Sequence, residues 1–158
     1  EICEGFVYNE YEGKVIELPS KIQDVPVTKI GERTFYQNSG RAGGLYIPDS
    51  VKHIAGGEFD GAGNLLCPQF GNSFHSIRLP SGLKKIERGT FAWCNLLEEI
   101  EIPETVEFIG DRAFQGCKKL SSLVIPKNVK YIGVRAFSAT GIKTLEFPPK
   151  RIFMGEHF

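Results

Sequence analysis

The 158-residue sequence has no excess of charge, because 19 lysines and arginines balance 19 aspartates and glutamates. A balanced chain offers no basic footprint for nucleic acid and no polybasic segment for an anionic membrane surface. The apolar runs are only a few residues long, far too short to span a bilayer. Nucleic-acid binding and membrane insertion are therefore not expected.

Cysteine and histidine are also sparse. The four cysteines, at positions 3, 67, 94 and 117, fall short of the density of a disulfide scaffold. Zinc sites usually pair Cys or His at spacings of roughly two to five residues, and the sequence holds no such pair. The glycine-rich segment 40–44 lacks the Lys-Ser/Thr that completes a phosphate loop. We therefore expect neither a metal nor a cofactor.

An internal repeat organises most of the chain. Pro80, Pro103 and Pro126 follow one another at intervals of 23 residues. The pattern Ile-x-x-x-x-Phe occurs five times, ending at Phe35, Phe59, Phe91, Phe114 and Phe137, and a degenerate copy, FMGEHF, occupies 153–158. A unit of this size has too few apolar residues to bury a core alone, so the period predicts a solenoid of stacked units.

The regular unit reads L-x-x-I-x-I-P-x-x-V-x-x-I-G-x-x-A-F-x-x-C. Alternating apolar residues before the proline predict a short strand, with Leu123 and Ile125 pointing inward in one copy. The following V-x-x-I segment should return along the opposite wall. The segment before the phenylalanine, DRAF in one unit, predicts a tight helical or 3-10 turn. We expect the five phenylalanines to form a buried column.

Segments such as LEEIEIPETVEFIGDRAF resemble the leucine-rich repeats of the BspA type, over roughly residues 14–150. The resemblance implies a right-handed, β-rich leucine-rich repeat solenoid of about five to six units. It also implies a secreted or cell-surface protein that acts in adhesion or protein binding. The compartment follows from the resemblance alone, because the sequence shows no secretory signal pattern.

The repeats predict a single domain over 1–158. The segment 5–18 alternates apolar residues around a glycine, so 1–18 reads as an N-terminal hairpin cap and first strand. The repeats then occupy 19–150, with an insertion at 66–76, and 151–158 form a degenerate last repeat. The insertion carries Phe70 and Phe74, which either fold back onto the solenoid or present an anchor to a partner.

The cysteine in IGDRAFQGCKKL looks reactive at first sight, but it recurs at a repeat position. Cys94 and Cys117 share this position, which other units fill with small residues, at Asn38, Ala62 and Thr140. We expect Cys94 and Cys117 to be buried free thiols, although neighbouring rungs would bring them within disulfide range. Cys67, with His75 eight residues on, leaves a cysteine-dependent enzyme as a remote alternative.

Outward strand positions vary from unit to unit, and binding specificity requires such differences. These positions should form a single file of Glu17, Tyr46, Arg78, Glu101, Val124 and Glu146. We expect a protein partner to contact Tyr46, Arg78 and Glu101, with Phe70 and Phe74 at the edge. The rival interpretations are a face selected only for solubility and a structural spacer within a larger surface protein. An open last rung also allows weak homodimer formation through the solenoid ends.

Overall fold

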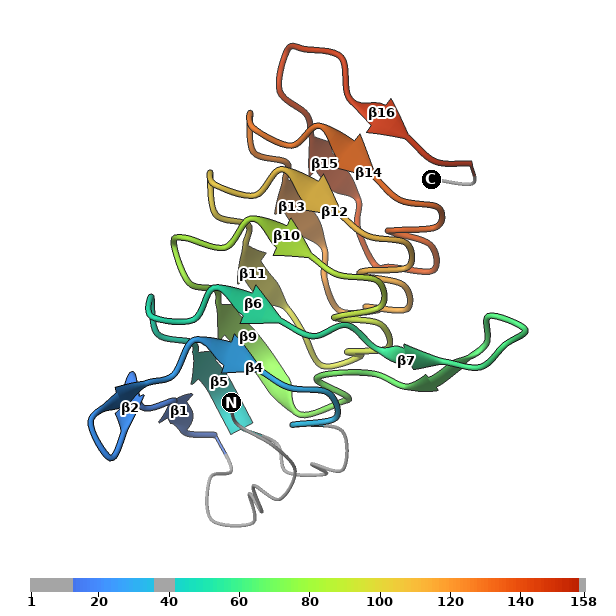
Figure 1. The fold of residues 1–158 in the computed structure, drawn as a ribbon. Helices are drawn as coiled ribbons and strands as arrows, with labels where there is room; N and C mark the ends of the chain where they lie inside the picture. The colour runs from blue at the N-terminus through green and yellow to red at the C-terminus, as the bar shows by residue number, and fades with distance from the viewer. Residues whose placement is uncertain (1–12, 36–41, 157–158) are drawn as a thin grey trace.

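The computed structural model describes residues 13–35 and 42–156, which form sixteen short strands and no helix (Figure 1). All of these strands except β2, β3, β7 and β8 stack in two columns, and each turn of the chain contributes one strand to each column (Figure 1). The described part of the chain therefore contains no helix that could cross a membrane.

The first column, here called the first face, consists of parallel strands. Four strands pair in the order β1–β5–β9–β11, and β13–β15 form a second pair that continues beside β11 (Figure 1). Their bounds are β1 Val15–Glu17, β5 Ala42–Tyr46, β9 Phe74–Arg78, β11 Glu99–Glu101, β13 Ser122–Val124 and β15 Thr144–Glu146.

The second column, here called the second face, is also parallel and pairs as β4–β6 and β10–β12–β14–β16. Its strands are β4 Lys29–Ile30, β6 His53–Ile54, β10 Lys85–Ile86, β12 Phe108–Ile109, β14 Tyr131–Ile132 and β16 Phe153–Met154. These are the V-x-x-I segments of the repeat, so the expected return along the opposite wall is confirmed. The core lies between the two faces, where Leu123, Ile125, Val129 and Ile132 are all buried.

A column of five phenylalanine rings fills the side of the core between the faces. Successive ring centroids lie 5.1, 5.1, 5.1 and 5.4 Å apart, and the rings are stacked. The members, in order, are Phe35, Phe70, Phe91, Phe114 and Phe137, all of them buried. Aromatic rings bury more surface than other side chains, so this column contributes strongly to the stacking of the rungs.

The expected place of Phe59 in this column is wrong, because Phe70 occupies it. Phe59 lies outside the core cluster and is only partly buried. The chain leaves the core after Ile54, forms the antiparallel hairpin of β7 (Glu58–Phe59) and β8 (Leu65–Cys67), and returns at Gln69. The inserted residues therefore precede Phe70, and the insertion expected at 66–76 is centred on this hairpin instead.

The segments around the stacked phenylalanines form consecutive turns and no regular helix, so the expected helical or 3-10 turns are not confirmed. Alternate amides donate to the next rung: the N–H groups of Gly89, Phe91 and Trp93 bond to the carbonyls of Asp111, Ala113 and Gln115. The amides between them bond within their own rung, three residues back. A helix would direct every amide along its own axis, so it could not link neighbouring rungs in this way.

This arrangement places the residue two positions before the stacked ring in the left-handed region. It is Arg33 (φ 56°), Gly89 (φ 64°), Arg112 (φ 55°) and Arg135 (φ 54°) in four of the rungs. A positive φ is energetically unfavourable for residues other than glycine, and the inter-rung hydrogen bonds on either side offset this cost. The glycine of the Ile-Gly pair is needed for close approach, since a Cβ on Gly133 would overlap the backbone of Asp111.

The first rung contains a second hairpin, formed by β2 (Lys21–Ile22) and β3 (Val25–Pro26). Gln23 and Asp24 at its tip both have positive φ, at 49° and 63°, as a two-residue hairpin turn requires. The predicted N-terminal hairpin over 5–18 lies mostly outside the described residues, which begin at 13 and include β1.

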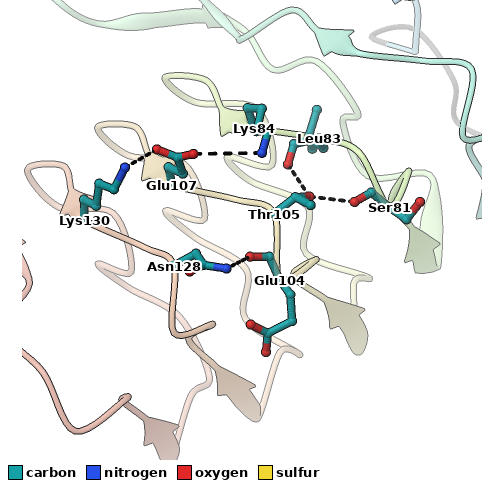
Figure 2. Close-up of polar contacts among 8 residues, drawn as sticks. All are labelled: Ser81, Leu83, Lys84, Glu104, Thr105, Glu107, Asn128 and Lys130. Carbon is teal, nitrogen blue, oxygen red and sulfur yellow. Dashed lines mark hydrogen bonds and ion pairs between the residues drawn. The ribbon is translucent and has the colours of Figure 1, made fainter.

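Polar side chains link the loops that run from the first face to the second (Figure 2). The Thr105 hydroxyl lies 2.6 Å from the Ser81 carbonyl oxygen and 2.8 Å from that of Leu83. One rung further on, the Asn128 side-chain amide donates to the Glu104 carbonyl at 2.7 Å. Each contact joins a side chain to the backbone of the preceding rung, so the loops are held in register without burying a charge.

Candidate partner-binding face

The outward residues of the first face form the expected file. The strand register pairs Glu17 with Tyr46, Tyr46 with Arg78, and Arg78 with Glu101. The β13–β15 pair continues it, with Val124 opposite Glu146. Parallel pairing places side chains of the same orientation next to one another. Tyr46, Arg78 and Glu101 therefore lie on three successive rungs of one surface.

Tyr46 and Arg78 contact each other within this file. The Arg78 guanidinium carbon lies 4.4 Å from the centre of the Tyr46 ring, which is a cation–π geometry. Nearby, the Ser81 backbone N–H donates to the Asp49 carboxylate at 2.7 Å and lowers the pKa of that group, with a smaller contribution from Arg78. The exposed Arg78 side chain therefore lies over the Tyr46 ring, on the same side of the molecule as the Asp49 carboxylate.

A groove of about 890 Å³ runs over β5, β9 and β11 on the first face. Its lining includes the half-buried Ile100 and the polar Tyr46 and Arg78, with the buried Ile77 and Leu79 beneath them. Further along the rungs the groove is bordered by the glutamates Glu98, Glu99, Glu101 and Glu104. Sites of protein contact commonly combine apolar surface with a charged rim in this way.

Glu98 differs from the other glutamates because it is already paired. It accepts hydrogen bonds from Lys119 Nζ at 2.8 Å and His75 Nδ1 at 3.2 Å. The bond from Lys119, followed by that from His75, lowers the pKa of Glu98. Among the residues that the structure describes, Glu99, Glu101 and Glu104 form no ion pair. The groove thus has a negative border that the protein itself does not neutralise.

The other two residues expected at the edge of this surface lie in the core. Phe70 and Phe74 are 0% and 2% exposed, and the two rings contact each other and Phe35. The expectation that they contact a partner is therefore wrong. The inserted chain folds back, so that Phe70 joins the ring column. Phe74, three residues before Ile77, is buried as Leu97 is, three residues before Ile100.

The β7–β8 hairpin projects from the stack on the side of the turns, away from the first face (Figure 1). The Arg88 guanidinium carbon lies 3.7 Å from the centre of the Phe59 ring, and Arg112 donates to the Gly63 carbonyl. Leu66 is 51% exposed on it. Two arginines from later rungs therefore hold the hairpin, which presents an apolar side chain to solvent.

Two of the three cysteines in the described part of the chain lie in the core. Cys94 and Cys117 are buried free thiols, and the Cys117 thiol donates to the Phe91 carbonyl. Burial raises the pKa of Cys94 well above its usual value and that of Cys117 to about 12. The Cys67 thiol is half-buried, and His75 hydrogen-bonds Glu98 instead.

The small-residue position of Cys94 and Cys117 is filled differently in the lengthened unit. Ser73, three residues after Phe70, is buried there, whereas the expected Ala62 is exposed in the hairpin. Asn38 lies outside the described residues. Within the described residues no three His, Cys, Asp or Glu side chains gather as metal ligands would.

The sequence analysis missed an aromatic row on the second face. Phe108 and Tyr131 stack with centroids 4.7 Å apart, and Tyr131 and Phe153 stack at 5.5 Å. Phe153, at the last described rung, is 68% exposed. The row could have been found from the sequence, because the residue just before the apolar residue that ends each second-face strand is aromatic in three successive units.

Comparison with solved structures shows where this fold occurs. The chain is 26% identical to a leucine-rich repeat protein of T. pallidum over 90% of its own length and 73% of that chain, with a TM-score of 0.71. It is also 26% identical to a leucine rich cell surface protein of Faecalibacterium prausnitzii, covering 90% of this chain and 38% of that one, with a TM-score of 0.68. A leucine-rich repeat protein from Bacteroides ovatus is 27% identical, covering 85% and 34%, with a TM-score of 0.66.

The chain spans little more than a third of the last two of these proteins. No curated protein sequence matches it. A family description does: the BspA type leucine rich repeat region, in six copies, matches residues 28–158. This range contains the ring column, the Ile-Gly turns and all of the parallel strands described above except β1. The chain therefore belongs to the BspA-type leucine-rich repeat family.

Proposed function

We propose that this chain is a non-enzymatic protein-binding module of a bacterial surface or secreted protein, and that it binds its partner through the first face. The observation that carries the proposal is the Tyr46–Arg78 cation–π pair beside the groove. Tyrosine and arginine, with tryptophan, are the residue types most enriched among the side chains that dominate protein interfaces. Display at the cell surface is supported by the F. prausnitzii relative, which is described as a cell surface protein.

The proposal also follows from what the other surfaces do. Inward strand positions are buried in the core, so they cannot contact a partner. The turn segments repeat with little change and are committed to inter-rung hydrogen bonds. Outward positions of the first face change from rung to rung, with Tyr46, Arg78 and Glu101 in succession. A surface that varies in this way can distinguish one protein from another.

The test is a binding measurement against a panel of extracellular matrix and cell-surface proteins, with the chain immobilised for biolayer interferometry. For any protein that is captured, Tyr46→Ala combined with Arg78→Ala should weaken Kd by about tenfold or more, the effect of losing a dominant contact. Phe153→Ala with Arg151→Ala is the matched control, because it removes the same kinds of exposed side chain elsewhere. Equal affinity of the Tyr46/Arg78 variant and wild type would reject the first face as the binding surface.

A second candidate function is a structural spacer. The uniform parallel register along the stack favours it, since a rigid rod of rungs separates whatever lies at its two ends. A spacer needs no partner on the first face. It is therefore supported if the panel captures nothing and if the Tyr46/Arg78 substitutions leave the behaviour of the whole surface protein unchanged.

A further inference from the structure

We propose that the first face around β11 docks an extended cationic protein segment with lysine or arginine at every second position. This inference rests on the proposed protein-binding function and specifies the chemistry of the partner. It arises from three carboxylates that the described residues leave without a cation, beside a groove with an apolar lining.

The charge argument concerns Glu99, Glu101 and Glu104. The neighbouring cations are committed elsewhere, because Lys119 is paired with Glu98 and Arg78 lies over Tyr46. Complementary charges across an interface steer association and select the partner. The border of the groove is therefore complementary to a positively charged segment and repels an anionic one.

The spacing argument concerns the direction of the segment. Glu99 and Glu101 are the first and last residues of β11, and both are exposed. Alternate residues of a strand lie about 6.6 Å apart on the same side, and an extended peptide has the same repeat. A segment aligned with β11 can therefore oppose both carboxylates with cations at positions i and i+2.

The apolar argument concerns what lies beside the carboxylates. Val124, on the next rung, is 61% exposed, and it lines a second hollow of about 380 Å³ together with Glu101, Glu104 and the half-buried Ile100. Lysine and arginine bury their aliphatic stems on such surface while the charged head reaches a carboxylate. The residues between the cations face away from β11, so the lysine and arginine stems supply the apolar contact.

The probe is a fluorescein-labelled decapeptide of alternating lysine and valine, titrated with the full chain and followed by fluorescence anisotropy. We expect saturable binding that weakens as salt is raised, because exposed charges are screened. Glu99→Gln with Glu101→Gln should raise Kd by about tenfold or more. Glu32→Gln with Glu156→Gln, which removes the same charge from exposed positions outside the groove, should leave Kd within about twofold.

Three results would overturn the inference: no saturable binding of the lysine–valine peptide, an equal loss in both glutamine variants, or equal binding of a glutamate–valine peptide. Far-ultraviolet circular dichroism would confirm that both variants remain folded. If the peptide fails while a whole protein is captured in a Tyr46- and Arg78-dependent way, the cationic partner is rejected and the binding face stands. If neither binds, both proposals fail together.

Discussion

Phe70 and Phe59 have exchanged the roles that their spacing suggests, and the exchange should be visible in unfolding experiments. Phe70→Ala and Phe114→Ala each remove a fully buried ring from the column and should cost about 3–5 kcal/mol. Phe59→Ala removes a partly buried ring outside the core and should cost about 1 kcal/mol. Urea unfolding followed by circular dichroism measures all three. If Phe59→Ala lowered the free energy of unfolding as much as Phe70→Ala does, Phe59 would have to be a member of the buried ring column.

The cysteines make a second residue-level prediction. A thiol must be exposed and deprotonated to react, and burial both hides the Cys94 and Cys117 thiols and raises their pKa values. A maleimide added at pH 8 should label the half-buried Cys67 well before either of them. Peptide mass spectrometry of the native protein after timed quenching identifies the labelled sites, and Cys67→Ser provides the control. Rapid labelling of Cys94 would mean that this position faces solvent.

The loops between the faces depend on the Thr105 contact. Its hydroxyl has one proton and two carbonyl oxygens within reach, so it links the backbone of Ser81 and Leu83 to its own rung (Figure 2). Thr105→Val keeps the shape and removes the donor, and it should cost about 1 kcal/mol in the free energy of unfolding. Lys84→Ala, which removes a wide ion pair to Glu107 at 3.9 Å, is the neighbouring control and should cost less. A larger loss of thermal stability for Lys84→Ala than for Thr105→Val would contradict this role of the Thr105 hydroxyl.

Elements were predictable from the sequence where the 23-residue spacing is regular. Both strands of each interior rung, the inward apolar positions and the buried free cysteines followed from alternation and period alone. The lengthened unit did not, because both Phe59 and Phe70 follow segments that could precede a stacked ring. The spacing after the preceding isoleucine favours Phe59 as the stacked ring. The structure instead buries Phe70 together with Ser73 and Phe74, and this requirement is visible only once the rungs are packed. The alternating hydrogen-bond pattern of the turn amides could not be predicted either, since it depends on the neighbouring rung.

The file Tyr46, Arg78, Glu101 was predictable because outward alternation and repeat register together define it. The two phenylalanines placed beside it were not, because apolar residues in an insertion are equally compatible with burial and with exposure. The contacts that make the face specific could not be read either. Nothing in the sequence indicates that Arg78 lies over Tyr46 or that Lys119 pairs with Glu98, leaving Glu99 and Glu101 without a cation.

The whole molecule behaves as a stack in which each rung contacts its neighbours, so its stability should be close to a sum over rungs. Deleting residues 95–117 removes 23 residues, joins Cys94 to Lys118 and restores the repeat register. We expect a folded, cooperative chain whose urea m-value is lower by about a seventh, in proportion to the surface lost. Deleting 95–114 instead breaks the register and should abolish cooperative unfolding. Cooperative unfolding of both deletions would argue against register-dependent stacking.

The β7–β8 hairpin separates contour length from axial length. Pro48 and Pro80 are 32 residues apart, and Pro80 and Pro103 only 23, yet in both cases the chain advances from one strand of the first face to the next. That advance is the spacing of neighbouring strands, about 4.8 Å. The extra residues of the longer unit extend sideways and add nothing along the stack. The distance over which this protein can hold two things apart is therefore set by how many rungs it has, and the number of its residues is a poor measure of that distance.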